Sequence, residues 1–312
     1  MRRKVFFIAT ILVVANFALV AQITDNEKKL QDVKTDSVSG WKFGAVAGLN
    51  FAQTKLVHWA AGGHSSLALN SIFSASANYF NGKHSWLNAL DLGYGLLNEE
   101  GSASRFKWRK TDDKINLSSQ YGYRAYQNFY YAALLDFKTQ FARGYDENDK
   151  PISDFLAPAY LTAGVGVSYQ PSKYFNVFFS PATARLVIVN DTAFAPNYSI
   201  KEGKTTRFEF GGYARIKFSK NDFKTPILKN IGITTKLDLF SNYLKNPQNI
   251  DVSWETLLAF KVNQYISINL STNLLYDDDT KISIIDAAGN EIAKEPRVQF
   301  KEILGIGASI KF

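Results

Sequence analysis

The stretch HWAAGGHSS, residues 58–66, gathers side chains that could take part in nucleophilic catalysis. It holds His58 and His64, two of the three histidines of the chain, and two serines. A serine activated by a histidine base would suit a hydrolase acting on membrane lipid. The sequence offers no recognisable third member, so we expect no enzyme and keep a lipid-modifying hydrolase as an alternative. Two histidines are also too few to hold a structural zinc ion.

Two stretches cluster carboxylates that could bind a hard cation: WRKTDDKIN, residues 108–116, and LYDDDTKIS, residues 275–283. Neither has the ligand spacing of an EF-hand. No phosphate-binding glycine loop, zinc spacing or nucleic-acid motif occurs, and the basic residues are scattered rather than gathered in a patch. We therefore expect solvated loop faces, with no cofactor, no bound metal and no nucleic-acid partner.

A third set of charged side chains falls on one side of a two-residue alternation that recurs along the chain. The set comprises Lys42, Asp91, Asp136, Lys138, Arg207, Glu209, Arg215, Lys217, Lys236, Asp238, Glu255, Lys261, Lys301 and Lys311. Unpaired charges are costly in a dry interior, so these must be hydrated or paired. They would either fill a closed barrel with ion pairs or line a narrow watery path for small polar or anionic solutes.

The elements that must position these charges are strands, as the last stretch illustrates. In residues 298–312, VQFKEILGIGASIKF, mostly apolar residues alternate with mostly small or polar ones. This period of two predicts a strand with different surroundings on its two faces. The terminal Phe312 also resembles the C-terminal aromatic that barrel-insertion machinery recognises, so we expect that machinery as a partner of the last strand.

The same alternation recurs in about twelve segments, as expected for the strands of an outer-membrane barrel. They cover residues 40–51, 67–79, 86–96, 106–123, 129–141, 161–169, 175–179, 207–218, 231–239, 252–261, 266–276 and 298–312. The predicted fold is all-β, a transmembrane antiparallel up-and-down β-barrel of about twelve strands. No window after the N-terminus reaches eighteen uncharged apolar residues, which excludes a helical membrane protein.

Connection lengths support this topology, because short and long connections alternate. Most connections after even strands are tight, as at Asn81-Gly82, whereas those after odd strands are long and polar. The long ones are expected near residues 53–66, 98–105, 143–159, 181–206, 241–250 and 277–297. Such alternation predicts that both termini and the short turns face the periplasm and that the long loops face outside.

The N-terminal residues 1–21 read as a secretory signal peptide, with Arg2, Arg3 and Lys4 before an apolar run. Residues 22–39 are polar and aperiodic and are expected to form a periplasmic tail, which leaves residues 40–312 for the barrel. The chain has no Cys, and export without cysteines suits a Gram-negative envelope. Aromatic residues at strand ends should form two interfacial girdles against outer-membrane lipid and lipopolysaccharide. These are Trp41, Tyr79, Trp86, Tyr94, Tyr121, Tyr123, Tyr169, Trp254, Tyr276 and Phe312.

Several stretches resemble an uncharacterised family of Bacteroidetes-type outer-membrane proteins. They are WAAGG (59–63), WRKTDD (108–113) with YGY (121–123), TQFARGY (139–145), FSPAT (179–183), and IDV (250–252) with LYDD (275–278). The resemblance implies an outer-membrane location and a barrel fold, and it brings no activity or catalytic residue.

The sequence thus predicts an outer-membrane barrel of unassigned role, either a narrow channel for small polar solutes or a structural or accessory barrel. The alternatives are the lipid-modifying hydrolase and a subunit of a larger envelope complex, which would add a protein partner.

Overall fold

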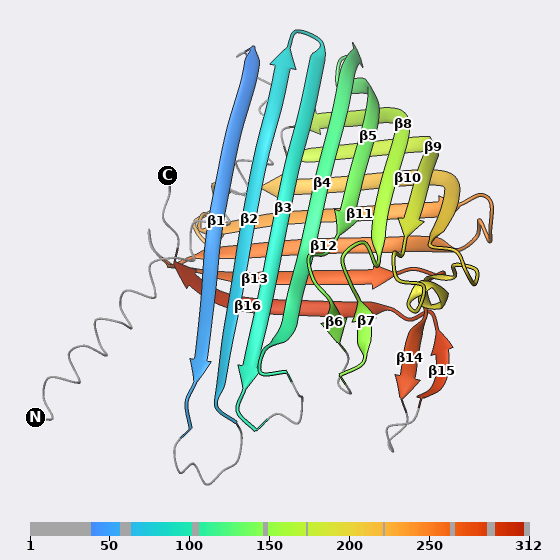
Figure 1. Ribbon diagram of the computed structural model, residues 1–312. Coiled ribbons are helices and arrows are strands. Elements are labelled where there is room, and N and C mark those ends of the chain that lie inside the picture. The colour runs from blue at the N-terminus through green and yellow to red at the C-terminus, as the bar shows by residue number, and fades with distance from the viewer. Residues whose placement is uncertain are drawn as a thin grey trace, which may run out of the picture.

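The structure is a computed structural model, and it describes residues 39–56, 64–101, 106–145, 149–172, 174–220, 222–262, 266–285 and 291–308. The predicted signal peptide and all but the last residue of the predicted tail lie outside these ranges. Twelve strands form one antiparallel sheet, each paired with the next strand of the sheet (Figure 1). They are β1 (Gly40–Thr54), β2 (Ser66–Asn81), β3 (His84–Glu99), β4 (Arg109–Tyr126), β5 (Phe129–Thr139), β8 (Ala159–Ser172), β9 (Phe175–Ile188), β10 (Thr206–Lys220), β11 (Ile231–Asn242), β12 (Ile250–Lys261), β13 (Ile266–Tyr276) and β16 (Gln299–Ala308).

This arrangement confirms the predicted fold class. Each of the twelve predicted segments overlaps one strand of the sheet, and spatial order follows chain order throughout. Short turns follow β2, β4, β8 and β12, and long loops follow β1, β3, β5, β9 and β13, as the connection lengths predicted. The connection after β11, residues 243–249, is shorter than predicted, and it is also shorter than the connection after β10, residues 221–230. In the part of the chain that the structure describes, no helix is long and apolar enough to cross a membrane.

The sheet is strongly twisted, so the strands at its two ends run in different directions. Figure 1 shows β1 to β4 crossing in front of β11, β12, β13 and β16, which run almost at right angles to them. Rotation between neighbouring strands accumulates over twelve strands and curls the sheet around an interior. The strand pairs recorded for the described residues run from β1 to β16, and none of them joins β16 back to β1.

Strand β9 corrects one prediction, because it continues to Ile188 where the sequence indicated a short strand ending at residue 179. Pro181 lacks a backbone donor, which disfavours a position inside a regular strand. The structure places it in a bulge, where the register with β8 shifts between Val165 and Val167. A proline is tolerated at such a position because no ladder hydrogen bond is required of it.

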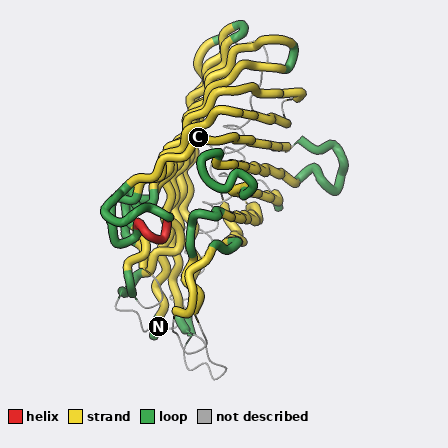
Figure 2. Tube along the Cα trace, turned by 90° about the vertical axis from the view of Figure 1, so that its right-hand side faces the viewer, coloured by secondary structure: helices red, strands yellow, loops and turns green. Residues whose placement is uncertain are grey.

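Two of the loops that were predicted to be long and polar contain small hairpins. The loop after β5 holds β6 (Gly144–Tyr145) and β7 (Pro151–Ser153), and the loop after β13 holds β14 (Ile282–Ile285) and β15 (Glu291–Glu295). The loop after β9 contains the short 3-10 helix η1 (Ala195–Tyr198). Figure 2 shows this helix in red, surrounded by loops at one side of the sheet.

Candidate functional site

The alternation of exposure along β5 shows which side chains face the interior. Tyr131 and Leu135 are 64% and 48% exposed on the outer face, whereas Leu134 and Asp136 are almost completely buried on the other. Apolar side chains therefore lie outside and a carboxylate lies inside, as the two-residue period predicted. The interior is where the charged side chains meet.

A buried triad joins strands that are not neighbours in the sheet. Arg215 of β10 donates from Nε to Asp238 Oδ1 at 2.7 Å, and from Nη2 to Asp238 Oδ2 at 3.1 Å and Asp136 Oδ2 at 2.5 Å. Asp238 lies on the adjacent β11, but Asp136 lies on β5, on the far side of β8 and β9. Ser118 donates a further hydrogen bond to Asp136 at 2.5 Å. The triad thus ties two distant parts of the wall together through the interior.

Three further charged groups border the triad on its more exposed side. Lys236 Nζ lies 3.1 Å from Glu255 Oε1, on the facing positions of β11 and β12. Lys138 Nζ lies 3.7 Å from Asp238 Oδ2, which is beyond hydrogen-bond distance. These three side chains are 25% to 35% exposed, compared with 10% or less for the triad.

A second ion-pair network lies nearer the long loops. Arg185 of β9 contacts Glu209 and Asp251, and its guanidinium lies 4.0 Å from the ring centroid of Phe240. Arg207 lies 3.0 Å from Glu209 and 2.7 Å from Asp279, although its guanidinium makes no hydrogen bond of good geometry. Alternating charges thus link β9, β10, β12 and the loop after β13.

Glycines on the inner face make room for long side chains. A Cβ atom on Gly93 of β3 would lie 3.1 Å from two carbons of Lys114, so that side chain lies flat over the glycine. Gly164 of β8 likewise leaves space for Thr183 and Ser180 of β9, where a Cβ would approach within 2.6 Å. Small wall residues therefore let the charged side chains extend across the interior instead of being forced outward.

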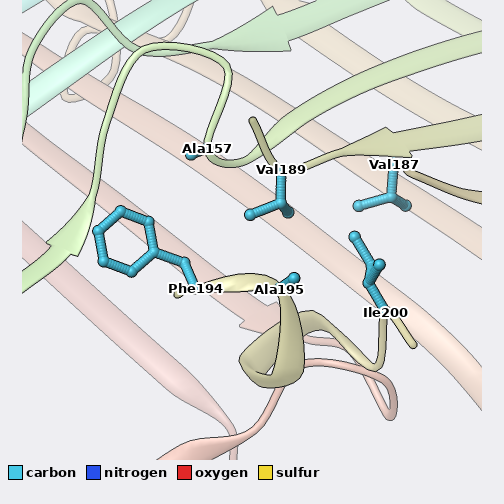
Figure 3. Close-up of a cluster of buried hydrophobic side chains, with 6 residues drawn as sticks. All are labelled: Ala157, Val187, Val189, Phe194, Ala195 and Ile200. Atoms are coloured by element: carbon cyan, nitrogen blue, oxygen red, sulfur yellow. The ribbon is translucent and has the colours of Figure 1, made fainter. Parts of the chain in front are cut away.

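The loop after β9 covers the inner face at the end of the sheet that carries the long loops. Val187 and Val189 pack with Phe194, Ala195 and Ile200 of this loop, together with Ala157 of the loop before β8 (Figure 3). All six are 5% exposed or less. Because Val187 lies on the same side of β9 as Arg185, the loop folds inward, and we name residues 189–205 the cover loop.

Asp279, in the loop after β13, holds the cover loop in place through a hydrogen bond. Its backbone oxygen accepts from Ser199 at 2.9 Å, and its carboxylate accepts from Lys245 at 2.5 Å. Burial would raise the pKa of Asp279, but the Lys245 hydrogen bond and the Arg207 charge outweigh it and hold the pKa below its usual range. Burial raises the pKa of Tyr198 in η1 to about 12, with a contribution from Asp277. Both side chains therefore keep a fixed protonation state at neutral pH.

Of the predicted interior residues, eight join the two networks: Asp136, Lys138, Arg207, Glu209, Arg215, Lys236, Asp238 and Glu255. Lys301 of β16 instead reaches Asp112 of β4 at 2.9 Å. Lys42 lies 5.5 Å from the ring centroid of Phe80, and Asp91 and Lys217 are half-buried on β3 and β10. The side chain of Lys261 and the whole of Lys311 lie outside the described residues.

Sequence reasoning missed Arg185 and Asp251, which hold the second network together. Arg185 lies in the part of β9 that was predicted to be a loop, and its inward neighbour Val187 is apolar, so the polar-inside alternation is hidden there. Asp251 precedes the predicted start of its strand by one residue, while β12 begins at Ile250.

Apart from Asp279, the described loop residues that could act in catalysis or bind a cation do not belong to the two ion-pair networks. His58 lies outside the described residues, and His64 is exposed beside Gly101. Asp113 binds Lys110 at 2.9 Å and accepts from the backbone of Phe141 and Ala142. Asp277 accepts from Asp279 N and the Thr280 hydroxyl. Within the described ranges, no three metal-ligating side chains are grouped.

Comparison with known proteins gives a family match and a similarity to solved structures. Residues 51–145 match a family described as a protein of unknown function (DUF3078), which agrees with the resemblance to an uncharacterised family. The crystal structure of the COG4313 outer membrane channel from Pseudomonas putida F1 is similar to this chain with a TM-score of 0.39 and 10% identity. That match covers 87% of this chain and 96% of the other. No curated protein matches the sequence significantly.

Proposed function

We propose that this chain is an outer-membrane β-barrel that provides a narrow path for small polar solutes. The observation that carries the proposal is the inverted polarity of the sheet. Phe43, Val165 and Leu304 are 60% to 76% exposed on the outer face, whereas Asp136, Glu209 and Arg215 are buried inside. Only a lipid surrounding makes such an outer face favourable over a whole sheet.

Strand lengths and aromatic positions support the same placement. The sheet strands contain 10 to 18 residues, enough for the 9 to 11 tilted residues that cross a bilayer. Trp41 packs against Tyr79 and Trp86 with ring centroids 5.3 and 5.7 Å apart, near the short turn after β2. Tyr121 and Tyr169 lie towards the same end of β4 and β8. This aromatic row is suited to a membrane interface.

The interior has two kinds of wall, and the path would run between them. The networks on β5 and on β9 to β12 form a charged ridge covered at one end by the cover loop. The facing wall contains small or neutral residues, including Gly93 of β3, Asn116 and Gln120 of β4, and Asn273 of β13. It also carries the charged residues Asp91, Lys114, Asp112 and Lys301, the last two as an ion pair. Polar and paired charged side chains on both walls favour small polar solutes over apolar ones.

The same proposal covers the export, the orientation and the partners of the barrel. Residues 1–21 would be removed on export, both termini would lie in the periplasm, and the last strand would bind the barrel-insertion machinery. Outer-membrane lipid and lipopolysaccharide would contact the apolar outer face. A partner protein in the envelope would have to bind the long loops or the turns.

Conductance of the purified, refolded protein in planar bilayers tests the proposal. Small, stepwise conductances at salt concentrations near 1 M are expected, and lasting silence would refute the path. Silence would then favour a structural or accessory barrel, which the triad linking β5 to β10 also supports. A lipid hydrolase would instead lose turnover in the His58→Ala and His64→Ala variants, whereas a path would keep its conductance.

A further inference from the structure

The charges beside the path differ in how far each is neutralised by its neighbours. On the charged ridge, three acidic and three basic residues form one group: Asp136, Lys138, Arg215, Lys236, Asp238 and Glu255. Their formal charges cancel. Any preference for one sign of solute must therefore come from which charges face water, rather than from the sum.

Both aspartates are turned away from water and neutralised at short range. Asp136 and Asp238 each accept hydrogen bonds from Arg215, and their side chains are 6% and 8% exposed. Charge-assisted hydrogen bonds of this kind fix the carboxylates on the guanidinium. The negative charges of both carboxylates are therefore already neutralised by Arg215 before an ion in the path approaches them.

Lys138 is the cation of this group that is held least firmly. Its single ion pair spans 3.7 Å to a carboxylate that Arg215 binds more closely, and its side chain is 33% exposed. Lys236 is bound to Glu255 at 3.1 Å, and the exposures of these two side chains, 25% and 35%, nearly balance. The ammonium of Lys138 is therefore the cation of this group that is bound least closely, and it lies on the more exposed side.

From this asymmetry, we infer that the path prefers small anions and that Lys138 determines the preference. The inference rests on the proposed path and names its substrate class: monovalent inorganic anions or small carboxylates. In water, a unit charge changes the local concentration of an ion about 4 Å away roughly fivefold. We therefore expect anions to permeate about three- to fivefold more readily than cations at low salt, with the ratio falling as salt screens the charge.

Reversal potentials across a potassium chloride gradient test the inference in the full mature chain. The Lys138→Gln variant should bring the chloride-to-potassium permeability ratio close to one while leaving conductance within about twofold. Lys138→Arg should restore the ratio, because it keeps the charge. Glu255→Gln should raise the ratio by releasing Lys236. Lys204→Gln, in the exposed part of the cover loop, is the matched control and should change nothing.

Three results would overturn the inference. One is a wild-type ratio at or below one, and the second is a Lys138→Gln ratio equal to that of wild type in a conducting protein. In both cases the proposed path would still hold, but its ion selectivity would not come from Lys138. The third is silence of every variant and of wild type, which would remove the proposed path itself.

Discussion

Replacement of Arg215 by methionine tests whether the buried triad holds the interior together. The change removes three hydrogen bonds, of 2.5, 2.7 and 3.1 Å, and leaves two buried carboxylates without their main counter-charge. Breaking a buried pair from one side costs about 3 to 5 kcal/mol. Ser118 still donates to Asp136, and Lys138 can move closer to Asp238, so we expect the lower end, about 3 kcal/mol.

The assay is reversible unfolding of the refolded protein in lipid vesicles by urea, followed by tryptophan fluorescence. The triple variant Arg215→Met with Asp136→Asn and Asp238→Asn should recover most of the lost stability, because it leaves no buried charge unpaired. Arg297→Met is the matched control. Its exposed pair with Glu295 should be worth less than about 1 kcal/mol.

Two outcomes would refute this reasoning. If Arg215→Met lost less than about 1 kcal/mol, water would already be neutralising both aspartates. If the triple variant were as unstable as the single one, the loss would come from the packing of the arginine side chain rather than from its charge.

The other predictions concern the cover loop and the sheet. Because the pKa of Asp279 is lowered, its stabilisation of the cover loop should be fully present above about pH 4 and be lost only as pH falls through the lowered value. Hydrogen exchange of residues 189–205, corrected for the intrinsic exchange rate at each pH, should show lower protection only at the acid end of a series from pH 7 to pH 3. Phe194→Ala should loosen the same residues by about 3 kcal/mol, seen as faster exchange there with little change in β5. Gly211→Ala should cost roughly 3 kcal/mol or prevent folding, because its Cβ would lie 1.8 Å from Ser241 O; unchanged urea unfolding would contradict this close approach.

Much of the fold could be predicted because a barrel strand has a short, local pattern. Each strand alternates between an apolar and a polar surrounding, so a few residues such as Tyr131, Leu135 and Asp136 suffice to identify it. The pattern failed at β9, where a bulge accommodates Pro181 and the inward Val187 packs under the cover loop. The missed Arg185 lies in that same segment.

The candidate site was predicted as a set of residues but not as an arrangement. Because side chains alternate between the two faces of a strand, the sequence places Asp136, Arg215 and Asp238 on the inner face. It does not indicate which residues they contact. Their mutual contact depends on the curl of the sheet, which brings β5 towards β10 across two intervening strands.

The sequence by itself determined the strand number, the order of the strands and the face on which charges such as Asp136, Arg215 and Asp238 lie, because these depend on a period of two and on loop lengths. Only the tertiary structure decided which charges are covered by a partner and which face water. That choice is set by distances between strands far apart in the chain. No local pattern encodes whether Lys138 or Arg215 is the nearer cation to Asp238.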